Sequence, residues 1–177
     1  VMTGVGSKSY WKVIWERING DGASNIINVE DMESQESKDI DDIGIFREIT
    51  QSFGIYVVRF EYKPKGMNLN RYTIDDEQKK AYLFYNYNGE VIKYSIYMND
   101  TDSSLGQKEL DQLLDEYTIE NSGVKIIVKE FDVDDSERNR YVAEFTYKDV
   151  HYQLKGIMIK SEFDEIIKNL IFIMKNA

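Results

Sequence analysis

The most regular pattern along the chain is a series of short segments in which apolar and polar residues alternate, separated by turn residues. Asn-Gly between two such segments is typical of a type I′ turn, whose two central residues need positive φ. Alternation of this kind predicts a sheet built of sequential antiparallel hairpins. The two predicted hairpins are 80–87 with 91–98 around Asn88-Gly89, and 141–147 with 150–159 around Lys148-Asp149.

Three more segments complete a prediction of about seven strands. In the first of them the side chains alternate, so that Tyr56, Val58, Phe60 and Tyr62 are expected to face the core and Val57, Arg59 and Glu61 the solvent. The other two are rich in β-branched and apolar residues. The three segments are 56–62, 69–74 and 124–131.

Apolar residues at helical spacing predict three helices in the same region. In the last of them, Ser161 is the predicted N-cap, and acidic residues fill the first turn. Gly54 is the predicted end of the first. Their apolar positions are Ile43, Phe46, Ile49 and Phe53; Leu110, Leu113, Leu114 and Tyr117; and Phe163, Ile166, Ile167, Leu170, Ile171 and Met174.

These elements predict an α+β fold, in which the C-terminal helix packs on an antiparallel, hairpin-built curved sheet. We expect residues 39–177 to form this single domain. Residues 19–38 are almost wholly polar and predict a linker, although a polar surface loop has the same composition. Residues 1–18 hold both tryptophans beside basic residues, which indicates either a juxtamembrane segment or a terminal helix docked on the domain.

Charge and composition narrow the classes of function. The chain has 32 acidic and 22 basic residues, a formal net charge of -10 that repels nucleic acid, so no nucleic-acid partner is expected. The chain contains no cysteine, which excludes disulfides and thiol catalysis but does not fix the compartment. No targeting signal is visible after Val1, so the start indicates a fragment or a processed cytoplasmic chain.

Candidate chemistry is sparse. His151 is the only histidine, and a strand position favours a structural role for it. A group of carboxylates between two strands is a candidate calcium site, although its spacing does not match an EF-hand and a solvated turn is the favoured interpretation. Tyrosines on both faces of the first hairpin are candidate ligand contacts, because they cannot all be core. These residues are Asp132, Asp134, Asp135 and Glu137 for the metal, and Tyr82, Tyr85, Tyr87, Tyr94 and Tyr97 for the ligand.

Part of the sequence resembles an uncharacterised family, a domain of unknown function. The residues that carry the resemblance are 62–67 (YKPKGM), 141–147 (YVAEFTY) with Asp149, 151–156 (HYQLKG), and 161–163 (SEF) leading into 166–170 (IIKNL). Members of this family form the C-terminal, extracytoplasmic domain of single-span membrane proteins of Gram-positive bacteria, some of them anti-sigma-factor-like. The resemblance implies an outer domain tethered by a span upstream of Val1, and it carries no catalytic residue.

We therefore expect a non-enzymatic sensory or ligand-binding domain on the extracytoplasmic side of a membrane-tethered protein, with a cytoplasmic location as the second interpretation. Its partner is an unidentified small ligand or protein, and no cofactor is expected. One alternative is a carrier that shelters an apolar ligand or lipid between sheet and helix. Another is a carboxylate-dependent hydrolase, which requires two acids with perturbed pKa values in one cleft.

Overall fold

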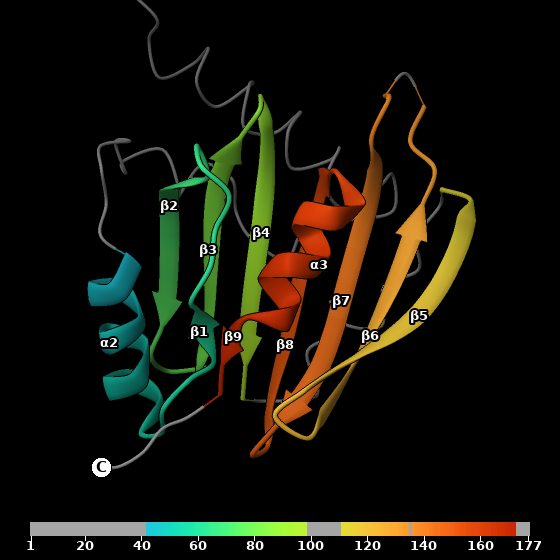
Figure 1. The fold of residues 1–177 in the computed structure, drawn as a ribbon. Coiled ribbons are helices and arrows are strands. Elements are labelled where there is room, and N and C mark those ends of the chain that lie inside the picture. Colours follow the sequence, from blue (N-terminus) through green and yellow to red (C-terminus); the bar gives the residue numbers. More distant parts are fainter. Residues whose placement is uncertain (1–41, 99–110, 135, 173–177) are drawn as a thin grey trace, which may run out of the picture.

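In the computed structural model, which describes residues 42–98, 111–134 and 136–172, seven strands form one open antiparallel sheet. Figure 1 shows the sheet with a helix at one edge and a second helix across its face. The strand order is β2-β3-β4-β8-β7-β6-β5. The strands are β2 (Asn68–Asp75), β3 (Lys80–Tyr87), β4 (Glu90–Tyr97), β5 (Leu113–Asn121), β6 (Val124–Phe131), β7 (Asn139–Tyr147) and β8 (Val150–Met158).

Both predicted hairpins are confirmed. β3 pairs with β4, and Asn88 and Gly89 between them have φ values of 53° and 77°. β7 pairs with β8, and Lys148 and Asp149 have φ values of 52° and 66° although neither is glycine. Two consecutive positive φ angles are what a type I′ turn requires, and its twist matches that of the flanking strands. The predicted strands 69–74 and 124–131 are also present, as β2 and β6.

One face of the sheet carries the remaining elements, namely α2 (Asp42–Phe53), α3 (Lys160–Lys168), and a short ribbon of β1 (Arg59–Phe60) and β9 (Leu170–Ile171). In Figure 1 the ribbon lies between the two helices, in front of β3 and β4. The α+β class with the C-terminal helix packed on an antiparallel sheet is therefore confirmed. The predicted segments 1–18 and 19–38 lie outside the described residues.

A chain of aromatic contacts runs through the core from α2, by way of β1, to strands β4, β8 and β7. The rings of Phe46 and Phe60 meet edge to face at 5.8 Å, and Phe60 lies 4.7 Å from Tyr94. Tyr94 then stacks on Tyr152 at 6.0 Å, and Tyr152 on Phe145 at 4.8 Å. Such offset and edge-to-face pairs add to the energy of burial itself, so α2 and the sheet share one continuous core.

The opposite face of the sheet holds buried polar and charged residues among aromatic ones such as Tyr82 and Phe84. Lys93 on β4 lies directly across from Lys155 on β8, and the two residues are 2% and 5% exposed. Like charges in register destabilise a strand pair, so this face needs compensating negative charge. Two carboxylates lie at this face: Asp111 forms an ion pair with Arg140, and Glu144 accepts a hydrogen bond from Gln153.

The predicted helix at 110–117 is wrong, because these residues belong mostly to strand β5. The apolar spacing of Leu113, Leu114 and Tyr117 imitates a helix, but a register irregularity between Leu113 and Asp115 interrupts the alternation of the strand. Beyond that point Tyr117 and Ile119 turn toward the core as alternate residues should. Leu113 and Leu114 are both 48% exposed, so neither anchors a helix.

The predicted strand at 56–62 is reduced to the two residues of β1, and its expected faces are partly reversed. Tyr56 is 73% exposed, whereas Val57 is buried. The first helix ends at Gly54, where φ is 81°, as predicted. On that helix Ile43 is 55% exposed, and Ile45 takes its place in the core beside Phe46 and Ile49.

The C-terminal helix is shorter than predicted. Its N-cap is Ile159 rather than Ser161, and the helix ends at Lys168 with Asn169 as C-cap. Leu170 then leaves the helix and pairs with Phe60, which makes β9 a strand. The predicted continuation to Met174 runs into residues 173–177, which lie outside the described part of the chain.

Candidate functional site

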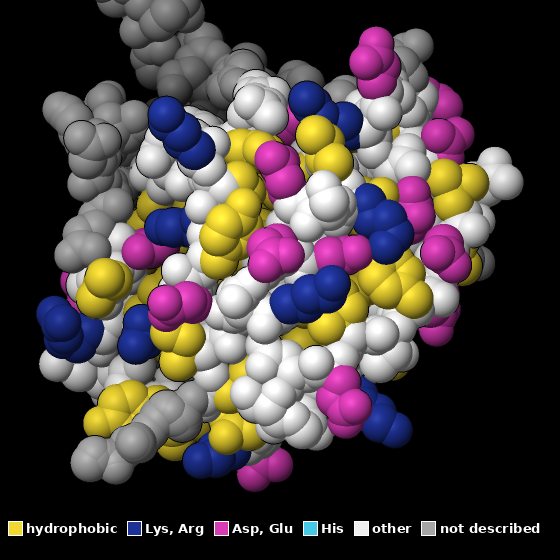
Figure 2. All heavy atoms as spheres, in the orientation of Figure 1, with side chains coloured by type: hydrophobic (Ala, Val, Ile, Leu, Met, Phe, Trp, Pro, Cys, Tyr) yellow, Lys and Arg dark blue, Asp and Glu magenta, His cyan; other side chains and the backbone are white. Residues whose placement is uncertain are grey.

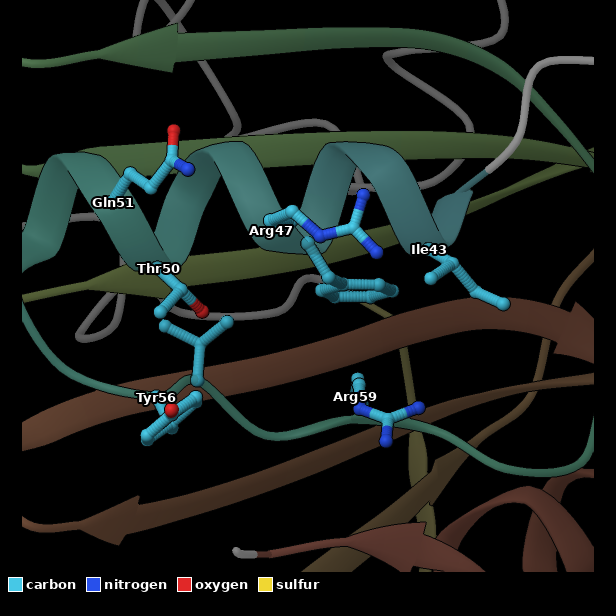
Figure 3. Close-up of a pocket in the computed structure, with 8 residues that line it drawn as sticks. Ile43, Arg47, Thr50, Gln51, Tyr56 and Arg59 are labelled. Atoms are coloured by element: carbon cyan, nitrogen blue, oxygen red, sulfur yellow. The ribbon is translucent and has the colours of Figure 1, made fainter. Parts of the chain in front are cut away.

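The candidate site is a surface groove of about 430 Å³ between the outer side of α2 and the extended segment that leads into β1. Its floor is apolar and its rim carries polar and exposed apolar side chains. Figure 3 shows Arg47 on α2 and Arg59 on β1 on opposite walls, with Ile43 and Tyr56 toward opposite ends. The lining residues are Ile43, Phe46, Arg47, Thr50, Gln51, Tyr56, Val57 and Arg59.

The helical wall follows from the periodicity of α2. Ile43, Arg47 and Thr50 recur at intervals of four and three, so they share one side of the helix. Phe46 lies beside this row and is only 3% exposed, and it therefore forms the floor where the helix meets the core. The helix thus presents an apolar base with a polar edge.

The N-terminus of this wall is fixed from beneath by the sheet. The Tyr85 hydroxyl donates a hydrogen bond to Asp42 Oδ2 at 3.0 Å, and Lys63 Nζ lies 2.5 Å from the same oxygen. Burial, followed by the nearby Asp42 charge, raises the pKa of Tyr85 well above its usual range. The phenol therefore stays protonated and continues to donate, and Asp42 also lies in the first turn, where a helix favours negative charge.

The extended wall is held by two other tyrosines. Tyr94 donates its hydroxyl to the Val58 carbonyl at 2.8 Å, and the Val58 N–H donates to the Tyr152 hydroxyl at 3.0 Å. Burial raises the pKa of Tyr94 well above its usual range, so this donor also stays protonated. Both walls of the groove are therefore positioned by phenols that rise from β3, β4 and β8.

The electrostatics of the groove are set by two arginines. Arg47 and Arg59 are exposed, and within the described residues neither guanidinium has a hydrogen-bond or ion-pair partner. In a chain with a net charge of -10, two uncompensated cations on facing walls make a local positive field. Guanidinium groups bind carboxylate or phosphate oxygens in pairs, so the arrangement can bind an anion.

The five predicted ligand-contact tyrosines are all buried, so the expectation that some of them face solvent is wrong. Their exposed fractions run from 0% to 6%. Tyr82 and Tyr97 meet edge to face at 5.6 Å on the second face of the sheet, and Tyr87 donates to Glu162 on α3. Tyr85 and Tyr94 support the groove from below. The full set is Tyr82, Tyr85, Tyr87, Tyr94 and Tyr97.

The predicted calcium site receives no support from the described part of the loop. Asp132, Asp134 and Glu137 are exposed, and among the described residues no three acidic or histidine side chains converge to hold a metal ion. Asp135 lies outside the described residues, so binding by the full quartet stays a prediction.

A second, smaller hollow of about 350 Å³ contains His151. The imidazole Nδ1 lies 3.1 Å from Thr146 Oγ1 on the neighbouring strand, and Glu144 in the same hollow accepts from Gln153 Nε2 at 2.9 Å. The other lining residues are Lys125, Ile127, Phe145, Thr146 and Tyr152. This arrangement holds the histidine in the strand pair, in agreement with a structural role.

The groove itself is absent from the sequence-based predictions. Two signals in the sequence point to it: Ile43 and Tyr56 are large apolar residues beyond what the core positions of α2 and β1 require, and each is followed by an arginine three or four positions later. The sequence patterns predict both residues in the core, because alternation and helical spacing do not decide which of two neighbouring apolar residues faces inward. Only the packing of the folded chain decides which of the two is buried.

The fold and the groove together define an α+β domain with an open antiparallel sheet. Residues 57–170 match the model of the domain of unknown function DUF4367, and the chain belongs to that family. The match begins at Val57, so it includes Val57 and Arg59 of the extended wall and leaves Tyr56 and α2 outside. The comparisons with curated proteins and with solved structures found no match.

No helix in the described ranges is both long enough and apolar enough to cross a membrane. Acidic and basic side chains are interspersed on the face that carries α3, without a large patch of either sign (Figure 2).

Proposed function

We propose that this chain is a non-enzymatic sensory or ligand-binding domain on the outer side of a membrane-tethered protein, and that α2 and β1 form its ligand site. The observation that carries the proposal is the groove, in which Arg47 and Arg59 lie over an apolar floor and have no hydrogen-bond or ion-pair partner among the described residues. Concave, mainly apolar surfaces with a few convergent polar groups are the usual form of ligand sites.

The exposed apolar residues support the same location. Ile43 and Tyr56 are among the few large apolar side chains of the described residues that are strongly exposed, at 55% and 73%, and both line the groove. Exposed apolar side chains gathered at one hollow mark an interaction site, whereas scattered ones do not. A rigid, amphipathic ring such as that of Tyr56 contacts a ligand at low entropic cost.

The carrier alternative has less support, because side chains fill the space between α3 and the sheet. Phe163, Ile166 and Ile167 of α3 are fully buried, and the Phe163 ring lies 5.3 Å from that of Tyr141 on β7. Gly156 on β8 leaves room only for Ile92, since a Cβ added there would lie 2.3 Å from Ile92 Cδ1. A lipid has no comparable space in this interface.

The hydrolase alternative also has less support. Asp76 has its pKa lowered by hydrogen bonds from Ser52 and Lys79, but it lies exposed on the turn after β2 rather than in a cleft. Among the described residues, the polar side chains that line the groove are two arginines, a threonine, a glutamine and a tyrosine, and none is a carboxylate or histidine. These side chains support ligand binding and offer no general acid or base.

A ligand screen tests the groove. Thermal unfolding of the wild-type chain is followed with calcium, cell-wall fragments, peptides and lipids, and then repeated with an Arg47→Gln/Arg59→Gln double variant. A ligand that binds only the folded state raises the midpoint, and we expect at least one stabilising ligand whose effect disappears in the double variant. A ligand shift that is equal in both proteins, or no shift with any ligand, contradicts the groove as the site.

The outer location has its own test, which the cysteine-free sequence makes simple. Glu77 lies exposed on the turn between β2 and β3, so Glu77→Cys introduces a single accessible thiol into this domain. In intact cells that express the full-length parent protein, we expect a membrane-impermeant maleimide to label this cysteine. Labelling only after lysis contradicts the outer location, and labelling of the purified protein controls for thiol reactivity.

A further inference from the structure

We infer that the groove binds the C-terminal end of a short, extended peptide, with the free carboxylate between Arg47 and Arg59 and an apolar side chain on the floor. This inference rests on the proposed function and names the class of ligand. Three features of the groove carry it: the arginine pair, the size and character of the floor, and the main chain of the extended wall.

The arginine pair selects a small planar anion. The two guanidinium groups come from opposite walls, one from α2 and one from β1 (Figure 3), and within the described residues neither has a protein partner. A guanidinium is a rigid fork of donors that matches the two oxygens of a carboxylate. The guanidinium groups on the two facing walls can both donate N–H hydrogen bonds to one carboxylate placed between them.

The floor selects a short ligand with an apolar side chain. Phe46 and Val57 are 3% and 6% exposed and form the base, while Ile43 and Tyr56 stand at the rim. The volume of about 430 Å³ lies in the lower part of the usual range for ligand sites, which is about 300–1,000 Å³. A few residues of peptide fit such a space, whereas a folded partner does not enter it.

The extended wall selects a peptide over other anions with an apolar part. Val58 gives its N–H and its C=O to Tyr152 and Tyr94, but among the described residues the main-chain groups of Tyr56 and Val57 form no hydrogen bonds. Backbone donors and acceptors tend to be paired, and an extended segment with open groups is a template for another extended chain. A fatty acid has no amides to offer these groups.

Calorimetric titrations test the inference with a defined probe. The probe is a pool of N-acetylated tripeptides made of valine, leucine and phenylalanine, supplied once with free carboxylates and once as C-terminal amides. Decanoate and inorganic phosphate are titrated separately as anions without a peptide backbone. The proteins are the wild type, the Arg47→Gln/Arg59→Gln double variant, and an Arg138→Gln control, which removes an arginine that does not line the groove.

We expect the free-acid pool to bind the wild type and the Arg138→Gln control equally. The amide pool, and the double variant with the free-acid pool, are each expected to bind about tenfold more weakly or worse, because charge-assisted hydrogen bonds are lost. Equal thermal midpoints of the three proteins without ligand show that the variants fold.

Three results overturn the inference. Equal binding of acids and amides shows that the carboxylate is not recognised. Tighter binding of decanoate or phosphate, if it is lost in the double variant, overturns the peptide while the proposed groove function stands. If none of these probes binds the wild type, the peptide inference fails, and the ligand screen described above decides separately whether the groove function fails with it.

Discussion

The two helices of this domain lie on the same face of one sheet, yet they differ in how completely their polar edges are satisfied. On α3, Glu162 accepts from Tyr87, and Asp164 accepts from Tyr117 at 2.6 Å and from Lys160 at 2.9 Å. On α2, the polar contacts lie near the two ends, at Asp42 and at Ser52, while Arg47 between them has no hydrogen-bond or ion-pair partner among the described residues.

The difference separates the part of the domain that holds the fold from the part that is free to bind. Two polar side chains of α3 tie the helix to the sheet, Asp164 to Tyr117 on β5 and Glu162 to Tyr87 at the end of β3. On the outer edge of α2, the exposed Arg47 has no hydrogen-bond or ion-pair partner among the described residues. Sites for ligands commonly sit on such incompletely satisfied surfaces of an otherwise rigid scaffold, where the scaffold fixes the geometry.

The largest expected effect comes from the buried side of α3. Phe163 is 0% exposed and packs on Tyr141, so Phe163→Ala should lower the free energy of unfolding by about 3–5 kcal/mol, the usual cost of removing a buried ring. Urea unfolding followed by circular dichroism measures the change. Ile159→Ala is the matched control, because Ile159 is 44% exposed and should have little effect. Equal losses in both variants would contradict the packing of α3.

The second-largest effect on stability is expected at alkaline pH, which should weaken the tyrosine hydrogen bonds around α3. Burial and the bond to Glu162 raise the pKa of Tyr87 to about 12, and burial, with the bonds to Asp164 and Glu130, also raises the pKa values of Tyr117 and Tyr141. Because an unfolded tyrosine loses its proton near pH 10, the folded state binds these protons more tightly. Stability should therefore be intact below about pH 10 and fall as pH rises through about 12.

Urea unfolding at a series of alkaline pH values measures this loss, and absorbance at the tyrosinate band follows the titration. Tyr87→Phe should make the pH dependence shallower, because it removes one of the protons that couple to folding. A free energy of unfolding that stays constant across this range would show that the phenols do not hold the helix.

A smaller effect is expected from the single residue that ties down the end of α3. The Asn121 side-chain amide lies within hydrogen-bond distance of the carbonyl oxygens of Ile167, Lys168 and Leu170, at 3.1, 3.2 and 3.1 Å. Asn121→Ala should therefore cost about 1–2 kcal/mol, within the range for lost hydrogen bonds of this kind. The adjacent exposed Glu120→Ala serves as a control, and the same urea assay measures both. An Asn121→Ala variant as stable as Glu120→Ala would mean that these carbonyls are equally well satisfied by water.

The smallest effect on stability is expected at the groove. Arg47 and Arg59 are exposed and without partners in the described fold, so the double change to glutamine should alter the free energy of unfolding by no more than about 0.5 kcal/mol. A loss as large as that of Asn121→Ala would place the arginines among the structural contacts and remove the contrast between the helices.

The sequence predicted best where local chemistry decides the structure. Asn88-Gly89 and Lys148-Asp149 each sit between two alternating segments, and a hairpin follows from neighbours in the chain. The prediction failed where distant contacts decide. Leu170 could continue a helix as well as a strand, and its pairing with Phe60 settles the choice across more than a hundred residues.

The candidate site is harder to predict, because it depends on which of two nearby apolar residues faces the core. Ile43 and Ile45 both precede Phe46 closely enough to face the core, and the structure buries Ile45. Tyr56 and Val57 present the same choice on the extended wall, and Val57 is buried. Each exposed member of these pairs lines the groove. The tyrosines that support it were visible in the sequence, but as ligand contacts rather than as supports.

The most direct test of the central claim is a map of the binding site on the protein. Backbone amide chemical shifts are recorded by NMR while the free-acid tripeptide pool is titrated into the wild-type domain. A ligand site formed by α2 and β1 predicts that the largest changes fall on residues 43–59, with little change on α3. Changes centred on α3 or on the exposed strand β5, with residues 43–59 unaffected, would contradict it.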